Sequence, residues 1–314
     1  MIRVENLVKN YGEVRAVRGI RFEVNDGEIL GFLGENGAGK TTTLKIITGF
    51  LSPTSGNVFV NDLNIIDDSL EIRRQVGYLP ELNPLYGEMM VYDLLQFTGQ
   101  VRGVHGTAFK SALNRVVGQC GLRGVVHKEV RACSKGYKQR IGLSCAMIHD
   151  PDILILDEPV SGLDPNQIVE IRELIKELGK EKTVIISSHI LQEVEATVDR
   201  IIILHKGEIV ADGTSGELMS GFRGHNQLTL EVKYAEEESL RELRDRMPDV
   251  AITDMSRQEG SRRLTLEYPK DVDARESIFH FAKEKGWVIL EMSQARVHLE
   301  DVFRNLTLEG ADRG

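Results

Sequence analysis

Apolar residues in the first two thirds of the chain fall into two kinds of pattern. Short runs with few polar residues, such as ILIL at 153–156 and IIIL at 201–204, predict strands that are buried on both faces. Stretches with apolar residues at helical spacing lie between these runs. The predicted strands are residues 27–34, 152–157, 183–188 and 200–204, and the predicted helices are residues 40–49, 165–179 and 191–197. This alternation predicts an α/β fold in which helices cover both faces of a parallel sheet.

The pattern differs in the middle and at the end of the chain. Residues 88–150 are helix-rich, with helices expected at Val91–Val101, Phe109–Cys120 and Gly136–His149. After residues 220–226, half-exposed strands and charged helices follow in the order β-α-β-β-α-β, which is typical of a small split-βαβ sandwich. We therefore expect a first domain over residues 1–222 and a small C-terminal α+β domain over residues 223–314.

Composition narrows the class of protein. The chain has 314 residues, enough for two domains, and its formal net charge of -9 weighs against nucleic acid as the main partner. Cys120, Cys133 and Cys145 lack the spacing of a metal site and are expected to be reduced. There is no secretory signal, and no apolar run approaches the about 18 residues of a membrane helix. These features predict a protein that works in the cytoplasm.

A glycine-rich segment, GENGAGKT at 34–41, lies between an apolar strand and a helix. Glycines at these positions let the backbone wrap a phosphate, and the helix N-terminus adds positive potential. A plain turn that ends in a helix cap is the alternative, but the flanking strand and helix favour a phosphate-binding loop, or P-loop. Lys40 is expected to reach the β- and γ-phosphates, and the Thr41 hydroxyl to bind Mg²⁺. The predicted nucleotide contacts are Gly34, Glu35, Asn36, Gly37, Ala38, Gly39, Lys40, Thr41 and Thr42.

Two adjacent carboxylates, Asp157 and Glu158, follow the apolar run at 153–156. Taken alone, such a pair is usually a solvated turn or a helix cap. With a P-loop upstream, the carboxyl end of this strand is a place where ligands bind. Asp157 then suits the Mg²⁺ shell, and Glu158 can orient or deprotonate an attacking water. No N-K-x-D guanine-recognition tetrapeptide is present, which argues against a GTPase.

Further short motifs occur in a fixed order: GYLPE at 77–81, SKGYKQR at 134–140, SGLDP at 161–165 and SSH at 187–189. With the P-loop, they make residues 1–220 resemble an ATP-binding-cassette (ABC) transporter ATP-binding subunit. The resemblance implies a P-loop NTPase fold in which a parallel-sheet core carries an antiparallel β subdomain and a helical subdomain. It also assigns roles: Tyr11 stacks on adenine, Glu81 joins the Mg²⁺ shell, Ser134 and Gly136 form the signature, Asp164 belongs to the D-loop, and His189 is the switch histidine.

One P-loop and one signature per chain imply a pair of subunits with two ATP molecules between them, and a homodimer is expected. Three positions depart from the family pattern, namely Glu81, Lys135 and Tyr137. Lys40, Asp157, Glu158 and His189 are all present, which indicates an active enzyme that uses ATP and Mg²⁺.

The segments at 77–97 and 298–307 are similar to subunits that drive ABC-2-type export permeases, such as gliding-motility and daunorubicin-resistance ATP-binding subunits. The resemblance implies a separate membrane permease, contacted by residues 82–105, and a place on the inner face of the cytoplasmic membrane. It leaves the cargo open. Two alternatives remain: a soluble ABC ATPase that acts on nucleic acid or ribosomes, and a regulatory cassette.

Overall fold

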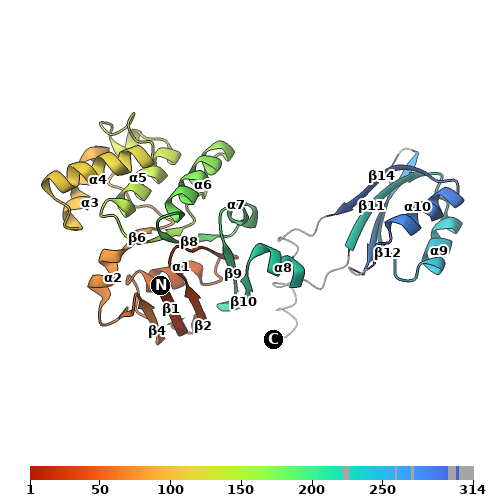
Figure 1. Ribbon diagram of the computed structural model, residues 1–314, viewed down its shortest axis with the longest axis horizontal. Helices are drawn as coiled ribbons and strands as arrows, with labels where there is room; N and C mark the ends of the chain where they lie inside the picture. The colour runs from red at the N-terminus through yellow and green to blue at the C-terminus, as the bar shows by residue number, and fades with distance from the viewer. Residues whose placement is uncertain (222–225, 259, 270–271, 296–301, 304–314) are drawn as a thin grey trace. The chain divides into compact units, whose positions relative to one another are not determined.

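The computed structural model describes residues 1–221, 226–258, 260–269, 272–295 and 302–303. They form two compact units, one over residues 1–215 and a second that begins at Gly216 (Figure 1). The boundary predicted at residue 222 lies outside the described residues. No described helix is long and apolar enough to cross a membrane.

A six-stranded sheet forms the centre of the first unit, in the order β10-β9-β3-β8-β7-β6. All neighbouring strands are parallel except β10, which runs antiparallel to β9. The strands are β3 (Ile29–Gly34), β6 (Val76–Leu79), β7 (Ile153–Asp157), β8 (Thr183–Ser188), β9 (Arg200–His205) and β10 (Glu208–Gly213). The predicted parallel sheet is confirmed.

Alternate residues of this sheet face two separate hydrophobic cores. On β7, Leu154 and Leu156 pack with the helices of the middle region, whereas Ile153 and Ile155 pack into a core on the opposite face. All four side chains are buried. This two-sided burial is the reason why the run from 153 to 156 contains no polar residue.

The second core joins the central sheet to helix α1 (Lys40–Ile47) and to an antiparallel sheet in the order β2-β1-β4-β5. Figure 1 shows α1 beside both sheets. The remaining elements of this region are β1 (Ile2–Tyr11), β2 (Val14–Val24), β4 (Ser55–Val60), β5 (Leu63–Asn64) and α2 (Ser69–Gln75). The antiparallel subdomain implied by the resemblance is therefore present.

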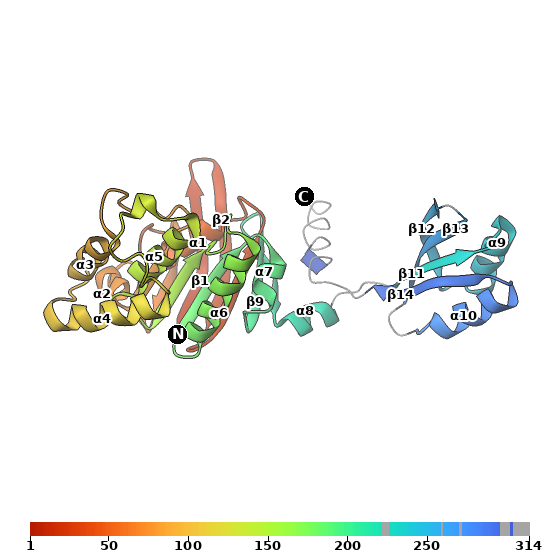
Figure 2. The same cartoon turned by 90° about the horizontal axis from the view of Figure 1, so that it is seen from above.

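The first core contains the helices of the middle region, which gather on one side of the unit in Figures 1 and 2. They are α3 (Val91–Val101), α4 (Gly106–Gln119), the 3₁₀ turn Val130–Ala132 and α5 (Lys135–Met147). Helix α6 (Pro165–Gly179), which follows β7, packs into the same core. Two short helices come later in the chain: α7 (Leu191–Glu195), and α8 (Ser215–Gly221), which begins at the last residue of the first unit. The predicted helical subdomain is confirmed. Cys120, Cys133 and Cys145 are free thiols.

The second unit is an antiparallel sheet in the order β12-β13-β11-β14, with two helices. Its elements are β11 (Asn226–Lys233), α9 (Glu237–Arg246), β12 (Ala251–Gln258), β13 (Ser261–Tyr268), α10 (Arg275–Glu284) and β14 (Val288–Ala295). This chain order and strand order are those of a split-βαβ sandwich. Leu240, Leu243, Ile278 and Phe281 of the helices pack in one core with the buried side chains of β11 and β13.

Candidate functional site

The predicted phosphate-binding loop connects the end of β3 to the start of α1. Gly37 and Gly39 have left-handed backbone, with φ of 84° and 104°. A Cβ atom at Gly39 would lie 2.5 Å from the carbonyl oxygen of Ala16, so this position has no room for a side chain. Glu35, Asn36 and Gly37 are exposed at the tip of the loop. Glycine at these two positions therefore permits the loop conformation that the sequence predicts.

The loop is also held from behind by the turn between β9 and β10. The N–H of Gly207 in this turn donates to the carbonyl oxygen of Ala38 at 3.0 Å, and the N–H of Ala38 donates to that of Glu35 at 3.1 Å. His205, at the end of β9, lies 3.9 Å from the Glu35 carboxylate. These contacts fix the loop before any ligand contributes.

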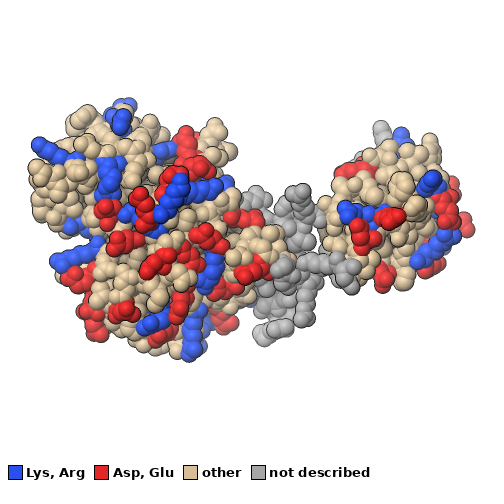
Figure 3. Space-filling model, viewed as in Figure 1, with Lys and Arg blue, Asp and Glu red and all other residues tan. Residues whose placement is uncertain are grey.

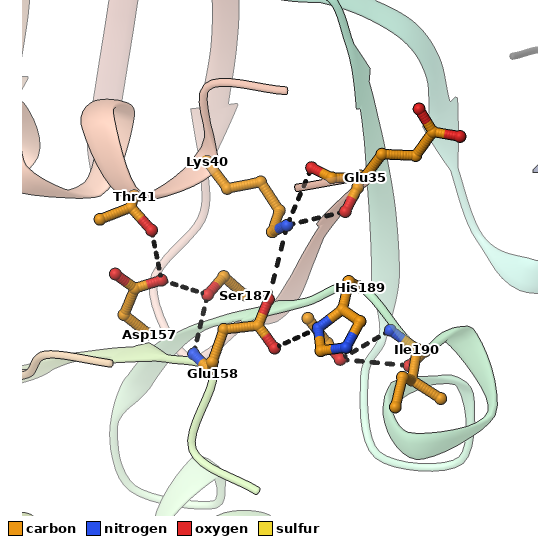
Figure 4. Close-up of polar contacts among 10 residues, drawn as sticks. Glu35, Lys40, Thr41, Asp157, Glu158, Ser187, His189 and Ile190 are labelled. Atoms are coloured by element: carbon orange, nitrogen blue, oxygen red, sulfur yellow. Dashed lines mark hydrogen bonds and ion pairs between the residues drawn. The ribbon is translucent and has the colours of Figure 1, made fainter. Parts of the chain in front are cut away.

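Lys40 is the first residue of α1, and its side chain is only 6% exposed. Its ammonium donates to the carbonyl oxygens of Gly34 at 2.7 Å and Glu35 at 3.3 Å. It also lies 3.4 Å from Oε1 of Glu158. Figure 4 shows the ammonium at the centre of these three contacts.

Asp157 is fully buried at the end of β7. Its Oδ1 accepts a hydrogen bond from the Ser187 hydroxyl at 2.6 Å and another from the Thr41 hydroxyl at 3.2 Å. Its Oδ2 faces the Tyr78 hydroxyl at 3.5 Å. Burial, together with the nearby charge of Asp157, raises the pKa of Tyr78. Tyr78 is thus a neutral donor toward this carboxylate.

Glu158 lies between a cation and a histidine. Its Oε1 faces Lys40, and its Oε2 lies 2.8 Å from Nδ1 of His189. The Glu158 backbone has φ of 49°, a left-handed conformation that non-glycine residues rarely adopt. Its N–H donates to the Ser187 hydroxyl at 2.9 Å. The three predicted catalytic residues, Lys40, Glu158 and His189, therefore meet in one place (Figure 4).

The oxygen atoms beside the loop suit Mg²⁺. Thr41 and Asp157 offer a hydroxyl and a carboxylate oxygen 3.2 Å apart, which are ligands of the kind that Mg²⁺ takes alongside water and phosphate oxygens. Glu81 is exposed, and no hydrogen bond or ion pair joins it to Thr41 or Asp157 in the described part of the chain. Its place in the metal shell stays a prediction. No group of three or more acidic, histidine or cysteine side chains suited to a metal occurs among the described residues.

The signature residues form a second cluster, at the start of α5. The Ser134 side chain caps the helix by accepting from the N–H of Tyr137 at 3.3 Å. Gly136 is buried, and a Cβ there would meet the side chain of Gln167 on α6 at 2.6 Å. Asp164 caps α6 by accepting from the N–H of Gln167 at 3.0 Å. These contacts describe helix caps, and the predicted nucleotide contacts of Ser134, Gly136 and Asp164 stay predictions.

Ser134, Gly136 and Asp164 line one groove between α5 and α6. No hydrogen bond or ion pair joins them to Lys40 or Glu158 within the described ranges. The ammonium of Lys135, one of the departures from the family pattern, occupies the space beside Gly162 where a Cβ would stand. The chain therefore presents two separate sets of predicted nucleotide-binding residues.

Tyr11 ends β1, and its ring is 49% exposed. The ammonium of Lys9 lies 5.5 Å from the centre of the ring. In the same hairpin, Ala16 of β2 touches the loop at Gly39. Tyr11 is therefore five residues away along the chain from Ala16, which contacts the phosphate-binding loop. The stacking of Tyr11 on adenine stays a prediction. The last predicted loop residue, Thr42, is partly buried in α1.

Sequence reasoning did not assign a role to Ser187 or Tyr78, although both contact Asp157. Ser187 lies inside the SSH motif that identified His189, and Tyr78 lies inside GYLPE. Both residues lie on strands that pair with β7, and this pairing is what brings their side chains to Asp157.

Comparisons with known proteins identify the family of the chain. The family model described as "ABC transporter" matches residues 17–161, and one described as "AAA domain, putative AbiEii toxin, Type IV TA system" matches residues 129–195. The chain is 34% identical to the uncharacterized ABC transporter ATP-binding protein YxlF of Bacillus subtilis, over 96% of this chain and 98% of that protein. It is 33% identical to the linearmycin resistance ATP-binding protein LnrL of Bacillus subtilis, over 98% of each. It is 39% identical to the bacitracin transport ATP-binding protein BcrA of Bacillus licheniformis, over 68% of this chain and 69% of that protein.

Solved structures of similar fold match more than two thirds of the chain. An ATP-binding subunit of an ABC transporter matches with a TM-score of 0.64 and 31% identity, over 70% of this chain and 92% of that one. A dimeric bacterial ABC transporter cassette, MJ0796, matches with a TM-score of 0.63 and 25% identity, over 68% and 98%. These matches support the transporter interpretation over a nucleic-acid or regulatory role. With relatives above 30% identity aligned along almost its whole length, the chain belongs to the ABC transporter ATP-binding proteins and is the ATP-binding subunit of such a transporter.

Proposed function

We propose that this subunit hydrolyses ATP to ADP and phosphate in a Mg²⁺-dependent reaction. The observation that carries the proposal is the placement of the Glu158 carboxylate between Lys40 and His189, beside a loop built for phosphate. A general base must be held within reach of the water that it activates. Figure 4 shows Glu158 held from both sides in this way.

Each side chain has a role that follows from its chemistry. The Lys40 ammonium neutralises charge on the β- and γ-phosphates. Glu158 accepts a proton from a water whose oxygen forms a bond to the γ-phosphorus, while the bond from that phosphorus to the leaving oxygen of ADP breaks. His189 keeps the Glu158 carboxylate in position. Thr41 and Asp157 would hold Mg²⁺, which would supply positive charge to the phosphate oxygens.

We propose that two copies of the chain act together, with Ser134 and Gly136 of each completing the ATP site of the other. The existence of two clusters in one chain supports this arrangement, since no hydrogen bond or ion pair among the described residues joins the signature to Lys40. The N-terminus of α5, capped by Ser134, is a favourable place for an anion. The dimeric cassette among the similar structures is consistent with it.

The subunit is proposed to drive a separate ABC-2-type membrane permease, in export, from the inner face of the cytoplasmic membrane. Large apolar side chains are exposed in and after the segment 82–90, which supports a docking surface there. Leu82 is 85% exposed, and the exposed rings of Tyr86 and Phe97 pack edge to face at 6.0 Å. Figure 3 shows basic and acidic side chains intermixed, with no broad basic area on the face that it presents. LnrL and BcrA carry resistance and transport names, which favours export.

The direct test of hydrolysis is Glu158→Gln, which keeps the size of the side chain and removes its basicity. We expect ATP to bind with ordinary affinity while turnover falls by roughly 10²–10⁴-fold, the typical contribution of a general base. Phosphate release and ATP binding by calorimetry measure the two effects. Glu177→Gln, an exposed glutamate on α6, is the control. Near-normal turnover in Glu158→Gln would show that another group is the base.

A further inference from the structure

We propose that Ser187 is a positioning residue of this site, whose single hydroxyl sets both the carboxylate of Asp157 and the main chain of Glu158. The functional importance of Ser187 rests on the proposed Mg²⁺-dependent hydrolysis, whereas its contacts with Asp157 and Glu158 do not depend on that proposal. It concerns a residue to which neither the sequence motifs nor the resemblance gave a role.

The geometry comes from the register of two neighbouring strands. Ser187 on β8 pairs directly with Asp157 on β7. Its hydroxyl donates to Oδ1 of Asp157 at 2.6 Å and accepts from the N–H of Glu158 at 2.9 Å. Both distances are those of good hydrogen bonds. All three residues are buried, so water does not compete readily for these contacts.

A serine hydroxyl suits this place because one small atom is both donor and acceptor. Alanine would leave Oδ1 of Asp157 with Thr41 as its remaining hydrogen-bond donor, and would leave the N–H of Glu158 buried without this acceptor. Unsatisfied buried groups of this kind are costly. Threonine keeps the hydroxyl and is compatible with a strand.

Two consequences for the chemistry follow. First, the hydrogen bond from Ser187 holds Oδ1 of Asp157 on the side that faces Thr41. Asp157 and Thr41 are the two residues proposed to hold Mg²⁺. Second, the left-handed backbone of Glu158 needs its surroundings to hold it, because the conformation is strained for a residue with a side chain. Ser187 supplies one of those restraints and so aims the Glu158 carboxylate at Lys40 and His189. One hydroxyl thus couples the metal side of the site to the base.

The test compares three variants: Ser187→Ala, Ser187→Thr and Ser144→Ala. Ser144 is a matched control, since it is a fully buried serine on α5 whose hydroxyl donates to the carbonyl oxygen of Arg140 at 2.9 Å. Each variant is measured in three ways. These are Mn²⁺ binding by electron paramagnetic resonance with a non-hydrolysable ATP analogue, binding of the analogue without metal, and steady-state hydrolysis. Melting temperature without ligand reports folding, and Ser187→Cys replaces Ser187→Ala if the latter does not fold.

We expect Ser187→Ala to weaken Mn²⁺ binding by about 10- to 100-fold, the usual effect of removing a group that orients a metal ligand, and to lower kcat on the same scale. Analogue binding without metal should be unchanged, and Ser187→Thr should recover most of both losses. Wild-type Mn²⁺ binding in Ser187→Ala, or an equal loss in Ser144→Ala, would overturn the inference. If the wild-type protein binds Mn²⁺ and the analogue but hydrolyses no ATP, the proposed function fails, while Mn²⁺ binding still decides the role of Ser187.

Discussion

The charge of Lys40 is balanced inside the protein by oxygen atoms of Gly34, Glu35 and Glu158. A buried ammonium requires such partners, because its transfer from water is costly. The carbonyl contacts also hold the side chain along the loop. Removal of Lys40 would therefore take away the cation proposed to face phosphate and also leave the buried Glu158 carboxylate with one partner fewer. Loss of nucleotide affinity and a change in stability are expected together.

A half-buried histidine, whose ring nitrogens are shielded from solvent, gives a prediction about pH. Burial, with the guanidinium of Arg102 nearby, lowers the pKa of His149 to about 4. In the unfolded chain this pKa is about 6.5, so between pH 6.5 and 4 the unfolded state binds more protons. The free energy of unfolding should therefore fall as the pH falls through this window. In His149→Gln this part of the pH dependence should disappear.

Melting curves from pH 7 to pH 4 measure the effect. His105→Gln is the control, since His105 is exposed in the same helical region, and it should melt with the pH dependence of the wild type. Identical curves for wild type and His149→Gln would contradict the prediction.

Much of the geometry of the site was predictable at the level of residues, because the motifs place their polar side chains at one edge of the sheet. Lys40, Glu158 and His189 were expected together, and they are in contact. The roles of Ser187 and Tyr78 depend on which strands neighbour β7, and a single sequence does not give strand order. That is why these two contacts appeared only in the structure.

At the level of elements, two helical glycines make a matched pair. A Cβ at Gly118, on α4, would meet open space, whereas one at Gly136, on α5, would meet Gln167. Gly118→Ala should stabilise the protein by about 0.5–1 kcal/mol, because alanine favours helix over glycine. Gly136→Ala should lose this gain or reverse it, because the Gln167 side chain must move.

Urea unfolding followed by circular dichroism measures the two free energies. Fluorescence would not serve, since the single tryptophan, Trp287, lies in the second unit. Gln167→Ala combined with Gly136→Ala should recover stability by opening the space. Equal gains in the free energy of unfolding for the two glycine variants would show that the Gln167 side chain on α6 moves aside at little cost.

Elements with a continuous pattern were predicted with their bounds. Val91–Val101, Pro165–Gly179 and Thr183–Ser188 agree with α3, α6 and β8. Helix α2 was missed because it has seven residues and only Ile72 is buried, so it carries no apolar stripe. Strand β5 has two residues, too few for any alternation. Short elements at the margin of a sheet are positioned by their neighbours and leave little trace in the sequence.

At the level of the whole molecule, the proposed pair of subunits can be tested with two inactive variants. Ser134→Arg should damage the site that a chain completes in its partner, and Lys40→Ala should damage the site of its own chain. A mixed pair then has one site with both defects and one with neither. ATPase activity across mixing ratios should rise from near zero to a maximum near equal amounts.

The mixture needs an independent check that mixed pairs form, which native mass spectrometry provides. Two Ser134→Arg preparations mixed with each other are the control. Activity that stays near zero at all ratios, with mixed pairs present, would mean that each site is built within one chain or that both sites must be intact.

The domain organisation was expected in outline, but its details depend on packing. The order of elements in the second unit was predicted, whereas its sheet order, β12-β13-β11-β14, follows from which strands pair. The core of that unit, with Leu228 and Leu266 fully buried, explains the period-2 alternation of its strands.

The left-handed backbone at Glu158 also bears on how this chain can change over evolutionary time. At most positions in a fold, alanine is tolerated better than glycine, but here glycine adopts φ of 49° without strain. Among variants that lack the carboxylate, Glu158→Gly should be more stable to urea than Glu158→Ala by about 1 kcal/mol. The reverse order would show that the conformation relaxes once the side chain is lost. In a lineage that no longer needed hydrolysis, substitutions to glycine or asparagine at this position would thus be favoured. On the proposed role of Glu158 as the base, a glutamate that persists there would be kept by selection on the reaction, against the preference of its own backbone.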